Sequence, residues 1–537
     1  MKITDLSLRE KILQTVVLRI RNDQFVPDNV GAAFFFGEII TDADEMGLDN
    51  ARKTLSRYIE NAKIPLLIAS DFENGCGSML KGLTPFPYMM GLGATNSEEI
   101  AYDYGKATAL EARSVGANWT FSPVCDLNIN RRNPLVNVRS IGDDPDLVCR
   151  LLKQVIRGMQ ENGLAACAKH FPGDGVDWRD QHGLTTNNTL SMEDWWRLHG
   201  RVFQELIDDG VMSVMSGHIT LPAYQKERFP GNNMYLPATL SHELVTNLLK
   251  KEMGFQGVAI TDALDMCGVM GYYKDLEEAE IEAFKAGYDM MTWPSANYVK
   301  NLTEAVENGY VSMERLDDAV TRILEMKEKL GLFERDNYPR EISAEEQAFI
   351  KQTQIRTAEN SVTLVRNDAG VFPLDKEKVK TIAVSPITHW EPALAEARLL
   401  CKELEDRGFT VKYYENSGVP ADVVKESDLT IYALFSRPFR PRGFLDFHAN
   451  EAGKVAYALF ESIPKVAIVS FGSPYFGEQF FEKAQTYVNA YTMLSPSVKA
   501  FVRAATGEIP FTDFSPVHLT TYEEETSAYK GWLPPKK

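Results

Sequence analysis

The chain has 537 residues, more than the roughly 250 to 300 at which a single hydrophobic core stops growing, so its length predicts two domains. With 44% hydrophobic and 25% charged residues, its composition is typical of a folded globular protein and excludes extensive disorder. The formal net charge of -18 argues against nucleic acid or anionic lipid as a partner, because both are bound through basic patches. We therefore expect a small or neutral substrate.

The first twenty residues, MKITDLSLREKILQTVVLRI, carry charges throughout and are predicted to form an amphipathic helix. They lack the apolar segment and cleavage site of a secretory signal, and no stretch reaches the roughly 20 apolar residues that cross a bilayer. We therefore expect no membrane partner and a cytoplasmic location. The cysteines form no CxxC pair and have no metal-ligand spacing, so we expect reduced, mostly buried thiols. They are Cys76, Cys125, Cys149, Cys167, Cys267 and Cys401.

Short apolar runs alternate with longer stretches of helical periodicity from about residue 29 to residue 334, which is the pattern of repeated βα units. Strands are expected at 30–36, 65–71, 119–127, 165–170, 213–218, 257–262 and 289–293. Helices are expected between them at 97–115, 145–162, 192–209, 241–253 and 276–286, and a charged helix at 313–329 follows. Such a series predicts a (β/α)8 TIM-type barrel over residues 1–334.

Residues 335–345, RDNYPREISAE, have the composition of a linker. Beyond them, strands are expected at 381–385, 410–414, 429–435 and 466–471, with helices at 392–405 and 450–461. This second part, residues 346–537, is predicted to be a smaller α/β sandwich domain.

Polar side chains end several of the expected strands of the first domain. They are Asp71, Asp126, Lys169, His170, His218 and Asp262. In a TIM-type barrel the carboxyl ends of the strands lie on one face, so these residues would lie close together at that end of the barrel. A dinucleotide-binding sheet is disfavoured because no GxGxxG follows a strand.

The densest polar segment is KHFPGDGVDWRDQH, residues 169–182, which leaves an apolar strand and turns at Pro172 and Gly173. Asp180 and His182 are two residues apart, so the carboxylate can orient the imidazole as an acid/base pair. The alternative is a surface loop with scattered charges. Lys169 follows a buried strand, where a lysine needs a carboxylate or a ligand as its partner.

A second segment, GFQGVAITDALDM at residues 254–266, delivers one carboxylate directly after a β-branched strand. Asp262 is therefore a candidate nucleophile, and a cap after the strand is the alternative interpretation. Asp265 is the neighbouring rival, although its position one turn later favours a capping role.

Asp71, Asp126, Arg139 and His218 are candidates for binding ligand hydroxyl groups. Each also has a simpler interpretation, because a lone histidine is commonly a core residue. Arg139, in VNVRSIGDDP, could instead form an ion pair with Asp143 or Asp144.

Together, KHFPGDGVDWRDQH, VAITDALDM, SDFENG, VNVRSIGDDP and SVMSGHITLPA resemble segments of the family 3 glycoside hydrolases, over the whole expected barrel. The KHFPG element followed by D-x-H is specific to the β-N-acetylglucosaminidase (β-N-acetylhexosaminidase) branch. The resemblance implies that Asp262 is the nucleophile, His182 the acid/base and Asp180 its partner. It also implies that the terminal sugar is surrounded by Asp71, Arg139, Lys169 and His170.

The chain departs from that pattern at two places. Asp174 stands where the branch often has histidine, and SDFENG replaces an acidic-Gln-Glu-Gly-Gly form. The β-glucosidase branch takes its acid/base glutamate from the second domain, and Glu478 in FGEQF is the one candidate for that role here.

The implied reaction is a retaining double displacement that removes a terminal β-linked N-acetylglucosamine from a small carbohydrate, such as a cell-wall or chitin fragment. It needs no metal or cofactor. Three alternatives stay open: a phosphorolytic variant, a β-glucosidase or β-xylosidase of the same fold, and a sugar-binding protein without turnover.

Overall fold

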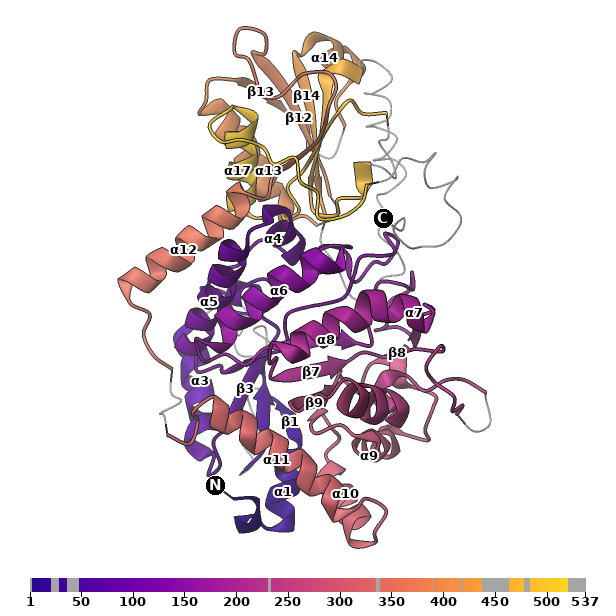
Figure 1. Cartoon of the computed structure of the whole chain (residues 1–537). Helices are drawn as coiled ribbons and strands as arrows, with labels where there is room; N and C mark the ends of the chain where they lie inside the picture. The colour runs from indigo at the N-terminus through magenta and orange to yellow at the C-terminus, as the bar shows by residue number, and fades with distance from the viewer. Residues whose placement is uncertain are drawn as a thin grey trace.

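The computed structural model describes residues 2–20, 29–35, 48–229, 233–334, 339–388, 390–415, 418–436, 463–477 and 483–519. It is a mixed α/β chain whose strands are mainly parallel. Figure 1 shows the N-terminal strands surrounded by helices, and a second α/β layer structure beyond them.

Eight described strands that precede residue 300 form two parallel sheets, in the orders β10-β1-β2-β3-β4 and β5-β7-β9. They are β1 (Val16–Arg19), β2 (Ala32–Phe34), β3 (Leu67–Ser70), β4 (Trp119–Thr120), β5 (Cys167–Phe171), β7 (Ser213–Ser216), β9 (Val258–Thr261) and β10 (Met291–Thr292). Single parallel bridges join the two sheets, from Trp119 to Ala165 and from Ile260 to Met290. A further short pair, β6 (Thr186–Asn187) and β8 (Ile219–Thr220), lies apart from them.

Neighbouring side chains on these strands pack into two different apolar clusters, as the alternation of a strand requires. Val17 and Ile260 belong to one cluster, to which α11 (Met313–Lys329) adds Ile323. Val16 and Ala259 belong to the other, larger cluster. Both faces of the strands are therefore buried, which explains their continuous apolar sequences.

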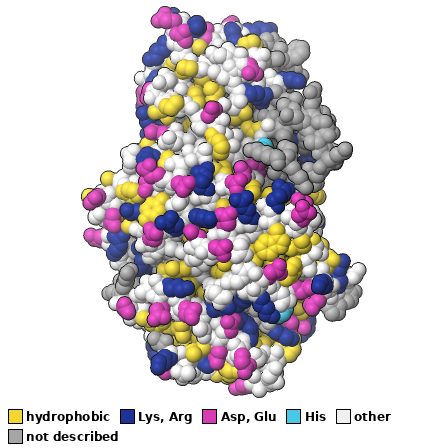
Figure 2. Space-filling view, viewed as in Figure 1, with side chains coloured by type: hydrophobic (Ala, Val, Ile, Leu, Met, Phe, Trp, Pro, Cys, Tyr) yellow, Lys and Arg dark blue, Asp and Glu magenta, His cyan; other side chains and the backbone are white. Residues whose placement is uncertain are grey.

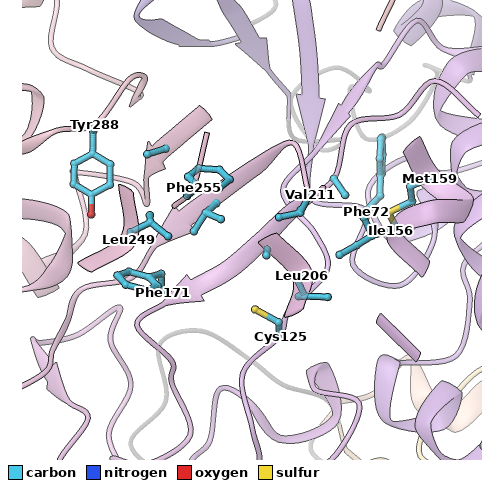
Figure 3. Close-up of a cluster of buried hydrophobic side chains, with 14 of the residues drawn as sticks. Phe72, Cys125, Ile156, Met159, Phe171, Leu206, Val211, Leu249, Phe255 and Tyr288 are labelled. Atoms are coloured by element: carbon cyan, nitrogen blue, oxygen red, sulfur yellow. The ribbon is translucent and has the colours of Figure 1, made fainter. Parts of the chain in front are cut away.

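The larger cluster lies between the strands and the helices that follow them. Figure 3 shows part of it, including Phe171 of β5 beside Leu249, and Leu206 of α8 (Arg201–Asp208). Burial of each such side chain stabilises the fold by about 1.5 to 3 kcal/mol. The helices are α1 (Leu8–Gln14), α3 (Leu48–Asn61), α4 (Met89–Thr95), α5 (Glu98–Ser114), α6 (Pro145–Gln160), α7 (Met192–Trp195), α8 (Arg201–Asp208), η6 (Glu243–Glu252), α9 (Leu276–Ala286), α10 (Tyr298–Glu307) and α11.

The C-terminal part is a six-stranded sheet in the order β11-β16-β15-β14-β12-β13, parallel except for the β11–β16 pair. Its strands are β11 (Thr363–Asn367), β12 (Thr381–Ile387), β13 (Thr410–Tyr413), β14 (Leu429–Phe435), β15 (Val466–Phe471) and β16 (Thr486–Asn489). The helices α13 (Ala393–Glu405) and α17 (Ser495–Ala505) cover one face, and α14 (Ala421–Glu426) contributes Val424 to a cluster on the other.

Helix α12 (Ala344–Glu359) connects the two parts (Figure 1). It contacts α5 and α4 on one side and α17 on the other. Arg356 pairs with Asp103 at 2.9 Å, and Gln354 donates to the carbonyl oxygen of Pro85 at 2.6 Å. These bonds fix the helix against the N-terminal part.

Most expected elements are confirmed within a few residues, and helix 276–286 agrees at both ends. The Ser97 hydroxyl caps α5 by accepting a hydrogen bond from the Ile100 backbone N–H. The prediction of an amphipathic helix in the first twenty residues is wrong in part, because the chain forms the short helix α1 and then enters strand β1. Strand 119–127 shrinks to two residues. Helix 192–209 contains a π-helical turn, and the predicted linker residues 344 and 345 already belong to α12. Expected helix 450–461 lies outside the described residues.

The cysteines fit the sequence expectation, and charges of both signs share the visible surface. In Figure 2, Lys and Arg side chains are interspersed with Asp and Glu side chains over the visible face. All cysteines are free, and each is buried except Cys267. Within the described ranges, no helix combines the length and apolarity needed to cross a bilayer.

Candidate active site

The expected site residues cluster at the carboxyl ends of the parallel strands. Asp71 directly follows β3, and Asp262 directly follows β9. Lys169 and His170 lie within β5, where the register with β7 shifts between residues 169 and 171. Such an irregularity redirects side chains at a strand end. The strands thus position Lys169, His170 and the carboxylates of Asp71 and Asp262.

A buried ion network occupies one side of the site. Glu73 binds Arg139 through both oxygens, with Nε 2.8 Å and Nη2 2.7 Å away. Lys169 Nζ lies 2.9 Å from Oδ1 of Asp71 and 2.8 Å from Oε1 of Glu73. Burial acts to lower the pKa of Lys169, but the charges of Asp71 and Glu73 outweigh it and raise the pKa. Lys169 and Arg139 therefore both stay charged.

His170 lies between two carboxylates. Its Nδ1 atom is 2.7 Å from Oδ2 of Asp126, and its Nε2 atom is 4.0 Å from Oδ2 of Asp262. Asp126 is fully buried, and its Oδ1 atom accepts the backbone N–H groups of His170 and Asp174 at 3.1 and 2.7 Å. Burial acts to raise the pKa of Asp126, yet His170 and these donors lower it. The ionised Asp126 thereby fixes the orientation of the His170 ring.

The acid/base candidates are in direct contact. Nδ1 of His182 lies 2.7 Å from Oδ1 of Asp180, which also accepts the His182 backbone N–H at 2.9 Å. A carboxylate at Nδ1 selects the tautomer with its proton on that atom and leaves Nε2 for proton transfer. Both side chains are largely buried, at 14% and 5% exposed.

The candidate nucleophile is ionised. Burial acts to raise the pKa of Asp262, but the charges of His218, His170, His182 and Lys169 lower it to about 2. Its Oδ1 atom accepts the Ala263 backbone N–H at 2.7 Å, while Oδ2 faces His170. His182 is one of the groups that lower this pKa, so the loop that carries His182 interacts electrostatically with the end of β9.

His218 is held entirely by protein groups. Its Nδ1 atom is 2.8 Å from Oγ1 of Thr239, and its Nε2 atom is 3.1 Å from the carbonyl oxygen of Ala263. Burial lowers the pKa of His218 to about 4, so the ring is neutral at neutral pH and its charge lowers the pKa of Asp262 only in acid, where the ring is protonated. The side chain supports the backbone next to Asp262.

One expectation, the ion pair of Arg139, changes in the structure. The suggested ion pair of Arg139 with Asp143 or Asp144 is wrong, since Glu73 takes that place. Asp265, the rival nucleophile, is 50% exposed at its side chain and lies 3.8 Å from Arg19. Glu478 lies outside the described residues.

Two further residues were not expected as parts of the site. Glu73 joins Arg139 to Lys169, and its position two residues after a strand-end aspartate was the available signal. Gln181, between Asp180 and His182, is fully buried and hydrogen-bonded to Asp174. Within the described residues, no group of three or more His, Cys, Asp or Glu side chains is arranged to hold a metal ion.

Comparison with known proteins places this site in a family. Residues 7–326 match the glycosyl hydrolase family 3 N-terminal domain. A beta-N-acetylglucosaminidase/beta-glucosidase of Cellulomonas fimi is 33% identical over 497 residues, which are 87% of this chain and 86% of that protein.

Two solved structures resemble the whole chain. The beta-glucoside phosphorylase BglX bound to 2FGlc is 31% identical, with a TM-score of 0.85 over 96% of this chain and 95% of the other. A family 3 beta-N-acetylglucosaminidase from Paenibacillus sp. str. FPU-7 is 26% identical, with a TM-score of 0.81 over 96% and 99%. Fold and site together define an enzyme of the glycoside hydrolase class. The chain belongs to glycosyl hydrolase family 3, which confirms the resemblance of its motifs.

Proposed function

We propose that the enzyme removes a terminal β-linked N-acetylglucosamine from a small glycoside, with retention of configuration. The observation that carries this proposal is the ionised Asp262 at the end of β9, next to a loop that presents the Asp180–His182 pair. A relative 33% identical over most of the chain is named a beta-N-acetylglucosaminidase/beta-glucosidase.

In the first step, an Asp262 oxygen attacks the anomeric carbon as the glycosidic C–O bond breaks. Protonated His182 transfers its Nε2 proton to the departing oxygen, and the sugar becomes an ester of Asp262. In the second step, neutral His182 takes a proton from water, whose oxygen attacks the same carbon and releases Asp262. Asp180 stabilises the charged imidazole in each cycle.

The ion network is proposed to bind the terminal sugar. Asp71, Arg139, Lys169 and His170 supply donors and acceptors for its hydroxyl groups. Asp126 and His218 act behind this layer, because Asp126 orients His170 and both ring nitrogens of His218 already have protein partners. No metal or cofactor takes part in these steps.

The architecture proposed for this activity is a closed (β/α)8-type barrel in residues 1–334, followed by a linker and an α/β sandwich domain from about residue 346. The bridges between the two N-terminal sheets and the apolar cluster shared by their strands support closure. The free, mostly buried cysteines support the proposed cytoplasmic location.

Phosphorolysis is the second candidate. It is favoured by the 31% identical structure named as a beta-glucoside phosphorylase. Once His182 has given up its proton it is neutral, so it does not repel an approaching phosphate as a carboxylate would. A phosphate oxygen would then attack the anomeric carbon of the Asp262 ester and release a sugar 1-phosphate.

Aryl β-glycosides of N-acetylglucosamine, glucose and xylose, each assayed with and without inorganic phosphate, test these proposals. The first candidate predicts the highest kcat/KM on the N-acetylglucosaminide and free sugar as product. Preference for glucoside or xyloside would replace the proposed substrate, and sugar 1-phosphate as the main product would establish the second candidate. No turnover on any substrate would indicate a sugar-binding protein.

A further inference from the structure

Gln181 lies between the two members of the acid/base pair and is fully buried. Its Nε2 atom donates to Oδ2 of Asp174 at 3.0 Å, and its Oε1 atom accepts the His218 backbone N–H at 2.8 Å. These bonds connect the tip of the loop to an earlier turn of the same loop and to the residues that follow β7.

The orientation of the Gln181 amide is fixed by its partners. A backbone N–H can only donate, so the oxygen of the amide must face His218 and the nitrogen must face Asp174. The other carboxylate oxygen of Asp174 accepts from Asn133 Nδ2 at 3.0 Å and from the Gly175 backbone N–H at 2.6 Å. The Asp174 backbone N–H donates to Asp126, which orients His170.

The backbone at Gly217 and at Gly268 packs closely against Gln181. A Cβ atom at Gly217 would lie 2.4 Å from Gln181 Oε1, and one at Gly268 would lie 2.5 Å from the Gln181 carbonyl oxygen. The Cys267 backbone N–H donates to the carbonyl oxygen of His182 at 3.2 Å. Glycine at 217 and 268 therefore permits a close approach that other residues would prevent.

We propose that Gln181 is the positioning residue of the acid/base loop. By bridging Asp174 and the His218 backbone, it holds Asp180 and His182 in reach of the leaving group above Asp262. A general acid must lie within hydrogen-bond distance of the atom it protonates, and a displacement of about 1 Å can cost roughly 10²-fold in rate. Asp174, where the resembled branch often has histidine, supplies the acceptor for this anchor. The inference rests on the proposed roles of His182 and Asp262.

A reciprocal exchange tests the anchor. Gln181→Glu places a carboxylate against Oδ2 of Asp174, and Asp174→Asn places an NH2 donor against Nε2 of Gln181. Each single variant is expected to slow glycosides with poor leaving groups by about 10- to 100-fold, while hydrolysis of dinitrophenyl glycosides in the first step changes little. In the double variant, the new amide at position 174 donates to the new carboxylate at position 181, whose other oxygen still accepts the His218 N–H.

The double variant is therefore expected to recover most of the lost rate. Because a buried carboxylate can impair folding, Gln181→Met is assayed beside it, with thermal unfolding measured for every variant. This substitution keeps the side-chain length but loses both hydrogen bonds, so the same selective slowing is expected. Equal slowing of good and poor leaving groups, or a double variant no faster than the slower single one, would overturn the inference.

The chain offers a matched control in a second Gln–Asp pair. Gln204 Nε2 donates to Oδ1 of Asp208 at 2.9 Å on α8. Gln204→Glu and Asp208→Asn are expected to leave the leaving-group dependence unchanged. The assay of His182→Ala distinguishes a failure of the Gln181 role from a failure of the proposed His182 role. If that variant shows no leaving-group dependence, the proposed acid/base role of His182 fails. If it does and the position 181 variants do not, only the role of Gln181 fails.

Discussion

The Nε2 atom of His170 lies 4.0 Å from Oδ2 of Asp262, on the side of the ring opposite its bond to Asp126. A carboxylate held in this way is stabilised in its charged form, although it is largely buried. The pKa of Asp262 is lowered to about 2, against the effect of burial, by His218, His170, His182 and Lys169 together. It prepares the residue for attack on an anomeric carbon, because only the ionised form is a nucleophile.

The lowered pKa of Asp262 predicts how the rate of covalent labelling depends on pH. A depressed carboxyl pKa contributes stability above its unfolded value of 3.8 and loses that contribution as the pH falls through about 2. Asp262 is then ionised at any pH well above about 2. We expect the rate of covalent labelling by a dinitrophenyl 2-deoxy-2-fluoro glycoside, which needs no general acid, to be constant between about pH 4 and 7. A fall in that rate with a midpoint near pH 5, in protein shown to be folded by circular dichroism, would contradict the assignment.

Loss of the nucleophile should abolish turnover without unfolding the chain. We expect Asp262→Asn to lower kcat by about 10³- to 10⁶-fold, since the carboxylate forms the covalent bond. Asp265→Asn is the matched control, because that residue is half exposed and contacts Arg19 only at 3.8 Å. Its effect should stay below about tenfold. A reversed order of the two variants would move the nucleophile to Asp265.

His182→Ala should have an effect that depends on the leaving group. A general acid contributes roughly 10²- to 10⁴-fold when the departing oxygen is basic, and little when a dinitrophenolate departs unaided. We therefore expect disaccharides to be slowed far more than dinitrophenyl glycosides in the first step, measured by pre-steady-state kinetics. Asp180→Asn should give a milder form of the same pattern. Equal slowing of both substrates would show that His182 only holds the loop, and the acid/base would have to be sought at Glu73, Asp174, Asp177 or Glu478.

The sequence predicted the helices and most strands of the fold because apolar periodicity and caps are local signals. It failed at β1, whose residues continue the apolar pattern of α1 without a break, and at the π-helical turn at 196–200, which has no such signal. Strand-end position identified Asp71, Lys169, His170 and Asp262. Two contacts of the site could not be predicted from local sequence patterns, because each joins residues that lie in different turns. They are the Arg139–Glu73 pair and the Gln181–Asp174 hydrogen bond.

Glu73 should stabilise the fold as well as the site. Glu73→Gln removes the charge that Arg139 and Lys169 share, although Asp71 still contacts Lys169. Removing one partner of a buried ion pair costs about 3 to 5 kcal/mol, and we expect a loss at the lower end of that range. Thermal and urea unfolding of the full chain measure it. Glu99→Gln is the control, because the exposed Glu99–Arg356 pair should contribute at most about 1 kcal/mol. Equal losses would mean that the Glu73 network is screened like a surface pair.

The most direct test of the proposed mechanism is to identify the residue that carries the sugar in the covalent intermediate. The enzyme is incubated with a dinitrophenyl 2-deoxy-2-fluoro glycoside, digested with a protease and analysed by tandem mass spectrometry. We predict a single labelled site, at Asp262, and no label in Asp262→Asn. A label on Asp265 or another carboxylate, or complete turnover of the reagent without any labelled peptide, would contradict a double displacement through Asp262.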